Sequence, residues 1–304
     1  MKAGFVSFLG RPNAGKSTLL NRIVGHKLAI VSDKPQTTRT RIVGVKNYDG
    51  GPGQDQPAGQ VVFVDTPGVH KPTHRMNVRM VDVALDAMRE VDVLCLVVDV
   101  SVKPGPGDRY LMKLLEDVKT PAILALNKVD LIAKPKLLPI IDHYQRAHSF
   151  VEIVPTSATD GTNVDVVEKL FLQYLPDGEP LYPPDYVTDQ PERFFIGEIV
   201  REQVLRLTHD ELPFSTAVIV DRIEPADDSG ITNIYCTILV DRESQKPIVI
   251  GRAGAMIKQI GTAARAELER YLESRVFLDL HVKVKSEWRD DERLLDEIGL
   301  RRDT

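Results

Sequence analysis

Short apolar runs alternate with longer amphipathic stretches through the first 178 residues. The runs have the length of strands, and the stretches between them repeat their apolar residues at helical spacing. This alternation predicts a mostly parallel sheet with helices on both faces, the doubly wound α/β class. The predicted strands are residues 5–9, 42–48, 61–65, 93–99, 122–126 and 151–155.

Two segments rich in helix- and strand-breaking residues interrupt the pattern. Residues 50–59 are dominated by Gly, Pro, Asp and Gln and predict a long hairpin loop. Residues 175–192 contain five prolines, which no regular element tolerates. We therefore expect a first domain over residues 1–178, a linker over 179–192 and a second domain over 193–304.

The second domain has a different pattern. Apolar residues recur at helical spacing over residues 195–207, and β-rich runs follow at 215–223 and 231–241. A short apolar run at 248–250, read as a strand end, leads through a glycine turn into a helical pattern that continues to Leu272. An alternating strand at 276–285 and a charged tail after Ser286 complete an α+β order of helix, strand, strand, helix pair, strand.

Composition sets limits on the class of protein. A chain of 304 residues fits two domains, and its longest apolar runs are far short of the roughly 20 residues of a membrane span. The first strand begins too near Met1 to leave room for a signal peptide. Cys95 and Cys236 lack any metal spacing and predict buried free thiols. We expect a cytoplasmic monomer, with peripheral contact at the inner membrane left open.

Charge is distributed unevenly along the chain. Residues 1–178 hold 22 Lys and Arg against 19 Asp and Glu, whereas residues 179–304 hold 17 against 25. A nucleic-acid site in the second domain must therefore be a local basic patch on an acidic body.

A phosphate-binding loop follows the first predicted strand. Residues 10–17 read Gly-Arg-Pro-Asn-Ala-Gly-Lys-Ser and fit G-x-x-x-x-G-K-[ST] between a strand and a helix. The backbone N–H groups and the helix N-terminus favour a phosphate, Lys16 adds a charge for its oxygens, and the Ser17 hydroxyl can bind Mg²⁺. The residues predicted to bind the phosphates are Asn13, Ala14, Gly15, Lys16, Ser17 and Thr18.

Two further segments are expected to contact the metal and the terminal phosphate. Asp65 ends the third predicted strand and can hold Mg²⁺ through water, while the Gly68 N–H can bond the γ-phosphate. A threonine between the first helix and second strand can complete the metal shell. We favour Thr38 because it directly precedes Arg39, and Thr37 remains the alternative. Lys16, Thr38 and Gly68 are thus the candidate catalytic residues.

A third motif predicts which base is bound. In Asn127-Lys128-Val129-Asp130, the Asp130 carboxylate can accept two hydrogen bonds from the guanine N1–H and exocyclic amine, a donor pair that adenine lacks. The backbone N–H groups of Ser157 and Ala158, after the sixth strand, can meet the guanine O6. The motifs together predict a guanine-nucleotide switch that uses GTP, GDP and Mg²⁺.

The residue after the third-strand motif bears on hydrolysis. Ras-like switches carry a water-orienting glutamine there, but this chain has Val69, which cannot orient water. Backbone groups, a cation or a partner must do so instead. His70 is adjacent, and we expect it to be a solvated loop residue.

The glycine turn of the second domain is a candidate RNA-binding site. Gly251-Arg252-Ala253-Gly254 precedes a helix that carries Lys258. A G-x-x-G turn lets backbone approach a nucleic-acid strand closely, with Arg252 and Lys258 near phosphates and an apolar groove for the bases.

These motifs resemble those of the Era family of GTPases over essentially the whole chain. The matching stretches are Gly-Arg-Pro-Asn-Ala-Gly-Lys-Ser-Thr (10–18), Pro-Gln-Thr-Thr-Arg (35–39), Asp-Thr-Pro-Gly-Val-His-Lys-Pro (65–72), the linker sequence 182–193 and Glu-Leu-Pro-Phe-Ser (211–215). The resemblance implies a GTPase domain and a type II KH domain. It also implies binding to the 3′ end of small-subunit ribosomal RNA during small-subunit assembly, and a way to position water without the glutamine.

The sequence departs from the family pattern at two places, and two rival functions remain open. The 50–59 segment is longer than the usual hairpin, and Ala253 stands at a turn position where a polar or basic residue or glycine is frequent. One rival is a signalling or membrane-associated GTPase whose acidic second domain binds proteins. The other, an ATP-using helper, is disfavoured by Asp130.

Overall fold

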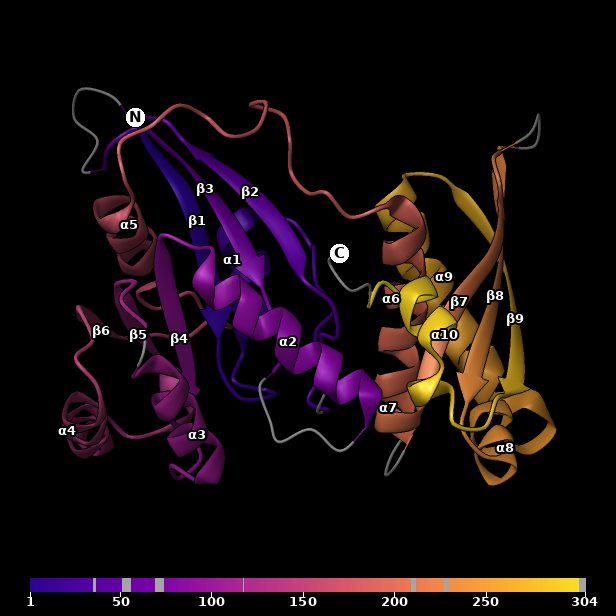
Figure 1. Ribbon diagram of the computed structural model, residues 1–304. Coiled ribbons are helices and arrows are strands. Elements are labelled where there is room, and N and C mark those ends of the chain that lie inside the picture. Colours follow the sequence, from indigo (N-terminus) through magenta and orange to yellow (C-terminus); the bar gives the residue numbers. More distant parts are fainter. Residues whose placement is uncertain are drawn as a thin grey trace. The chain divides into compact units, whose positions relative to one another are not determined.

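The chain folds into two compact units in a computed structural model (Figure 1). The structure describes residues 1–34, 37–50, 56–68, 74–116, 118–208, 212–226 and 230–300. The first unit comprises Met1–Ala29, Thr38–Pro72 and Met80–Asp189, and the second comprises Ile30–Thr37, Thr73–Arg79 and Gln190–Thr304. The second unit thus includes two short pieces of the N-terminal sequence.

The first unit is built on a six-stranded sheet in the order β2-β3-β1-β4-β5-β6. All neighbouring pairs are parallel except β2 and β3, which form an antiparallel hairpin. The predicted strands and the doubly wound class are confirmed. The strands are β1 (Lys2–Leu9), β2 (Ile42–Tyr48), β3 (Gly59–Asp65), β4 (Val93–Asp99), β5 (Ala122–Asn127) and β6 (Glu152–Pro155).

Helices cover both faces of this sheet (Figure 1). They are α1 (Lys16–Val24), α2 (Arg75–Arg89), α3 (Pro106–Leu115), α4 (Leu137–Ala147) and α5 (Val164–Tyr174). One core joins Leu9, Leu96 and Leu124 of the sheet to apolar residues of α2, α3 and α4. On the opposite face, Phe8 and Phe63 stack with centroids 5.7 Å apart, and the ring of Phe171 in α5 meets both edge-on. The central strands β4 and β5 are apolar up to their last residue because both of their faces are buried.

The predicted linker is docked along the first unit. The Gln60 side chain, fully buried in β3, accepts hydrogen bonds from the N–H groups of Leu181 (2.7 Å) and Tyr182 (2.8 Å). Its amide also donates to the Tyr182 carbonyl at 2.8 Å. Further along, the Val45 N–H of the edge strand β2 donates to the Val187 carbonyl at 2.8 Å. The prolines therefore exclude regular secondary structure from this segment, but its backbone is still hydrogen-bonded to the first unit at residues 181, 182 and 187.

The second unit is built on a three-stranded sheet in the order β7-β8-β9, with β8 and β9 parallel. Helices α6 and α9 pack on it around a core that contains Val200, Ile238 and Ala264. Its elements are α6 (Glu192–Leu207), α7 (Leu212–Ser215), β7 (Thr216–Glu224), β8 (Ile231–Val240), α8 (Lys246–Ile250), α9 (Ala255–Leu272), β9 (Arg275–Val284) and α10 (Glu292–Glu297). This matches the predicted order of helix, strand, strand, helix pair, strand.

Two details of that prediction are corrected. Residues 248–250 belong to helix α8 and do not end a strand. The charged tail after Ser286 is folded: a 3₁₀ turn (Trp288–Asp290) precedes α10, and Trp288, Leu295 and Leu300 are buried. The Trp288 indole N–H donates to the Ser215 carbonyl at 2.9 Å. Apolar side chains spaced between the charges thus anchor this segment.

Several predictions fall on residues that the structure leaves undescribed. Residues 51–55 of the 50–59 loop, together with Val69 and His70, lie outside the described ranges. Within those ranges, no helix combines the length and the apolar character needed to cross a membrane.

The docked linker leads to a first prediction. Gln60→Leu removes three hydrogen bonds to Leu181 and Tyr182 and leaves these partly buried backbone groups without their Gln60 partner, which costs about 1 kcal/mol or more. Amide hydrogen exchange at Leu181 and Tyr182 should accelerate by roughly tenfold or more. Gln173→Leu, at an exposed position of α5, is the control. Equal protection in the two variants would contradict the role given to Gln60.

Candidate nucleotide-binding site and RNA-binding turn

The loop between β1 and α1 has the backbone of a phosphate cradle. Gly10, Asn13 and Gly15 have positive φ values of 154°, 63° and 96°. A Cβ on Gly10 would lie 2.4 Å from the Val97 carbonyl oxygen, and one on Gly15 would lie 2.2 Å from Asn127 Nδ2. Both positions therefore require glycine for steric as well as conformational reasons.

Lys16 is buried at the start of α1. Its ammonium faces the carbonyl oxygens of Gly10 and Arg11, each at 3.4 Å. Burial lowers the pKa of Lys16, and the nearby charge of Asp65 opposes that shift. A phosphate in the cradle would supply the negative charge that favours the ammonium form.

Three oxygen-bearing side chains converge beside the cradle, from the start of α1 (Ser17), the end of β3 (Asp65) and the segment before β2 (Thr38). The Ser17 hydroxyl donates to Asp65 Oδ2 at 2.6 Å and lies 2.7 Å from Thr38 Oγ1. The Thr38 hydroxyl lies 3.4 Å from the same carboxylate oxygen. The Thr37 hydroxyl instead donates to the Lys34 carbonyl. The structure therefore brings Thr38, the favoured threonine, to Ser17 and Asp65.

The donor set suits a hard divalent cation. Asp65 is fully buried, and its Oδ1 has no hydrogen-bond partner among the described residues. Burial raises the pKa of Asp65, while Lys16 and the two hydroxyls act in the opposite direction. A carboxylate and hydroxyls are ligands that Mg²⁺ prefers, so Ser17, Thr38 and Asp65 fit the predicted metal.

Gly68 approaches the phosphate loop closely. A Cβ at this position would lie 2.7 Å from both N and Cα of Pro12. The Thr66 hydroxyl donates to the Phe8 carbonyl at 2.7 Å and fixes the start of the segment. Gly68 is thus held against Pro12 of the phosphate loop.

Asn127 links the phosphate loop to the predicted base-contacting loop. Its amide donates to the Ala14 carbonyl at 2.8 Å, and its Oδ1 accepts the Ala158 N–H at 2.9 Å. Ser157, beside Ala158, is fully buried. A contact from the Ala158 N–H to guanine O6 would therefore be shared with Asn127, an arrangement the motif order alone does not indicate.

Lys128 and Asp130 lie on the turn after β5. Lys128 has φ 68°, and its ammonium donates to Asp99 Oδ2 at 2.6 Å. Asp130 lies in the 3₁₀ turn Val129–Leu131 and is exposed. Its carboxylate is thus accessible to the edge of a bound base.

Two residues that support this site were missed by the sequence reasoning. Arg22 of α1 donates to the carbonyls of Ala158 (2.6 Å) and Thr159, so the phosphate-loop helix holds the base-contacting loop. Asp99 holds Lys128. The end of a predicted parallel strand was a usable signal for Asp99, whereas nothing local indicates the role of Arg22.

The glycine turn of the second unit joins α8 to α9. Gly251, Ala253 and Gly254 have φ values of 74°, 51° and 78°. A Cβ on Gly251 would lie 2.6 Å from the Met256 N, whereas one on Gly254 would meet open space. Arg252, like Lys258 in α9, is exposed. The turn therefore exposes Arg252, and α9 exposes Lys258 shortly after it. Ala253 adopts a backbone conformation that favours glycine.

Other candidate chemistry is absent from the described parts of the chain. Groups of His, Cys, Asp or Glu that could hold a metal by themselves are not found there. Cys95 and Cys236 are free and buried, as predicted. Burial raises the pKa of Cys236 to about 12, so this thiol remains protonated and unreactive.

Comparisons with protein families match the two units separately. A family described as "50S ribosome-binding GTPase" matches residues 5–128, and a family described as "KH domain" matches residues 211–289. The chain is 48% identical to the "GTPase Era" of Geobacter metallireducens over 98% of this chain and 97% of that protein. It is 47% identical to the "GTPase Era" of Geotalea uraniireducens with the same coverage.

Two solved structures are similar over nearly the whole length. A variant of Aquifex aeolicus Era bound to GDP and AlF4⁻ is 40% identical, with a TM-score of 0.92 and coverage of 99% of this chain and 100% of that one. Era in complex with MgGDPNP and nucleotides 1506–1542 of 16S ribosomal RNA is also 40% identical, with a TM-score of 0.93 and the same coverage.

The exposed carboxylate of Asp130 generates a prediction about the base. Asp130→Asn should weaken GTP binding by about a hundredfold or more, because guanine donors would lose their charged acceptor. The same variant should bind xanthosine triphosphate more tightly, since the new amide can donate to the xanthine 2-oxo group. Competition titrations with both nucleotides measure the change. Full GTP preference in the variant would show that Asp130 does not read the base.

Proposed function

The chain belongs to the Era family of GTPases, and we propose that it is a GTP-dependent switch that binds ribosomal RNA in small-subunit assembly. The chain is a GTPase with a P-loop domain and a KH domain, and it binds guanine nucleotide with Mg²⁺. The convergence of Ser17, Thr38 and Asp65 beside the phosphate cradle is the observation that carries the proposal for this chain's own residues.

The geometry supports different roles for these residues in GTP hydrolysis. The backbone of residues 13–18 and the Lys16 ammonium hold the phosphates in place, with the glycines allowing close approach. Ser17, Thr38 and Asp65 hold the Mg²⁺, which neutralises charge on the phosphate oxygens. The Gly68 N–H, close to Pro12, contacts the terminal phosphate. These groups orient the phosphates and stabilise their negative charge. The attacking water must be positioned by groups other than the Val69 side chain.

Base selection rests on the turn after β5. Asp130 accepts the two guanine donors, and Lys128, fixed by Asp99, lies beside the base. Asn127 links this turn to the phosphate loop through the Ala14 carbonyl, and to the loop of Ser157 and Ala158 through the Ala158 N–H. A base that lacks the donor pair would leave the Asp130 carboxylate without partners, which disfavours adenine.

The second domain supplies the RNA contact. We assign the RNA strand to Gly251, Arg252, Ala253, Gly254 and Lys258, with the half-buried Ile250 and Ile257 near the bases. The similarity to Era in complex with nucleotides 1506–1542 of 16S ribosomal RNA supports the 3′ end of small-subunit ribosomal RNA as the target. The partner is then the small ribosomal subunit.

We extend the proposal to the domain boundaries, the oligomeric state and the location of the protein. We place the GTP-binding domain at residues 1–178, the linker at 179–192 and the KH domain at 193–304. We propose that the protein acts as a monomer in the cytoplasm. Peripheral contact with the inner membrane is the one alternative location retained from the sequence.

The RNA assignment is tested by charge reversal in the turn. Arg252→Glu should weaken binding of a small-subunit 3′-end RNA and lower the salt slope of its affinity by about one. Gly254→Asp should weaken binding further, because it puts a side chain and a negative charge where the RNA backbone approaches. GTP affinity should stay unchanged in both variants.

Titration of labelled RNA at several salt concentrations measures the RNA affinity and its salt slope. The matched control is Arg265→Glu, because Arg265 is exposed further along α9. An equal loss in Arg252→Glu and Arg265→Glu would mean that the charge acts through the whole acidic domain and not at the turn. No RNA binding by the unaltered protein would leave a protein-binding second domain as the better explanation.

A further inference from the structure

Arg11 is a charged residue inside the phosphate loop whose side chain takes no part in the contacts described above. Its Nη1 donates to Asp108 Oδ2 at 2.9 Å, and Asp108 lies in the first turn of α3. The side chain of Arg11 is 38% exposed, whereas that of Asp108 is only 6% exposed. A cation in the loop expected to bind phosphates is thus paired with a buried carboxylate of the protein itself.

The Asp108 carboxylate is a well-anchored partner. The same Oδ2 accepts the N–H of Gly105, directly before α3, at 2.7 Å. The Gly105 carbonyl in turn accepts the N–H of Asp108 at 3.1 Å. Further along the helix, Leu111 and Leu115 are buried in the core of the first unit. The position of the carboxylate is therefore set by α3, which the core holds in place.

The aliphatic part of the Arg11 side chain lies against Gly107 of the same helix. A Cβ on Gly107 would lie 3.1 Å from Arg11 Nε and 3.2 Å from Cδ, closer than an ordinary van der Waals contact. Glycine inside a helix is destabilising, so its presence here is explained by the room that Arg11 requires. Arg11 is thus held along its length by Gly107 and at its end by Asp108.

The backbone of Arg11 contacts the lysine of the phosphate loop. The Arg11 carbonyl oxygen accepts the Ala14 N–H at 3.3 Å, and it lies 3.4 Å from the Lys16 ammonium. At the other end of the loop, the Asn127 amide donates to the Ala14 carbonyl at 2.8 Å. The loop is therefore held at Ala14 by Asn127 and at Arg11 by Asp108.

We propose that Arg11, fixed by Asp108, is a positioning residue for the β-phosphate of the bound nucleotide. With the pair intact, the Arg11 carbonyl directs the Lys16 ammonium to the place of the β-phosphate. Without the pair, the loop adopts other positions, and affinity falls with the fraction of molecules that can bind. The inference rests on the proposed function and adds a pair of residues that the loop motif does not define.

A simple effect of charge would give a different result. Loss of the Arg11 cation alone should weaken the binding of an anion, whereas loss of the Asp108 charge should strengthen it. If the pair positions the loop, both changes should weaken binding, because either one breaks the contact. The direction of the change in Asp108→Asn therefore separates positioning from charge.

The test measures dissociation constants for GDP and GMP, with Mg²⁺ and without RNA, in the full-length protein. The proteins are the unaltered chain, Arg11→Ala, Asp108→Asn and the double variant. GDP affinity should fall about tenfold in each single variant. GMP affinity should change by less than about twofold, because Lys16 reaches the β- and γ-phosphates that GMP lacks. The double variant should lose about tenfold and not a hundredfold, since the two changes break one pair.

The matched control for charge is Arg109→Ala. Arg109 follows Asp108 in α3 and is exposed, so this variant removes the same charge from the same helix turn without touching the pair. Its affinities for GDP and GMP should match those of the unaltered chain.

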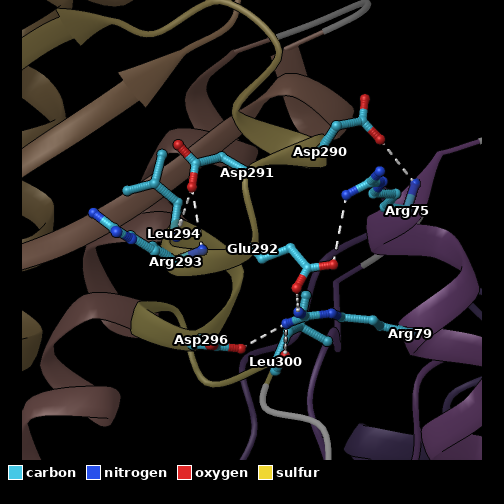
Figure 2. A network of polar contacts seen from close by, with 9 residues as sticks. All are labelled: Arg75, Arg79, Asp290, Asp291, Glu292, Arg293, Leu294, Asp296 and Leu300. Carbon is cyan, nitrogen blue, oxygen red and sulfur yellow. Dashed lines mark hydrogen bonds and ion pairs between the residues drawn. The ribbon is translucent and has the colours of Figure 1, made fainter.

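A second control breaks an arginine–aspartate pair that contains no residue of the phosphate loop. Figure 2 shows Arg79 directed at Asp296, with Nη1 2.6 Å from Oδ1, and both residues belong to the second unit. Asp296→Asn should leave GDP affinity unchanged. This result would show that the expected loss in Arg11→Ala is not the effect of breaking any ion pair.

Thermal melting shows whether each variant keeps its fold. If Arg11→Ala does not fold, Arg11→Lys, which keeps the charge but loses the planar fork, should show the same selective loss for GDP. Tighter GDP binding by Asp108→Asn, equal losses for GDP and GMP, or unchanged GDP affinity in both single variants would overturn the inference alone. An unaltered chain that binds GDP no more tightly than GMP would instead remove the proposed phosphate cradle.

Discussion

The burial of the Asp65 carboxylate at the end of β3 is the constraint on which the nucleotide site depends. This group is removed from solvent, with Ser17 and Thr38 hydroxyls at Oδ2 and no partner for Oδ1 in the described part of the protein. Such a charge is stable only with positive charge beside it. Lys16 supplies one such charge, and under the proposed function a bound Mg²⁺ would supply the other. The start of α1 and the segment before β2 meet there, and each provides a hydroxyl at this carboxylate.

The motif residues could be predicted from the sequence because their chemistry is local. Glycines at fixed offsets from Lys16, and Asp130 at a fixed offset from Asn127, identify a cradle and a base-binding turn without knowledge of the packing. The sequence left two threonines open for the metal. In the structure the Thr37 hydroxyl donates to the Lys34 carbonyl while the Thr38 hydroxyl lies beside Ser17, which favours Thr38.

The supporting residues could not be predicted because their partners lie far away along the chain. Arg22 contacts a carbonyl 136 residues away, and Arg201 contacts one 164 residues away. The hydrophobic periodicity of a sequence does not predict contacts between residues so far apart in the chain. Local ambiguity explains the other misses: three apolar residues at 248–250 suit a helix as well as a strand, and the many charges after Ser286 concealed the few apolar residues, Trp288 among them, that fold the tail.

The central claim is that Thr38, with Ser17 and Asp65, forms a metal site that depends on the γ-phosphate. Calorimetric titration of GDPNP and GDP over a range of Mg²⁺ concentrations tests it most directly, with Thr38→Ala compared with Thr37→Ala. The account predicts that Thr38→Ala raises the Mg²⁺ concentration needed for GDPNP binding by about tenfold or more, with GDP binding unaffected. Thr37→Ala, which keeps the carbonyl bound by Arg201, should change either value by less than about twofold. Equal effects of the two substitutions would contradict the account.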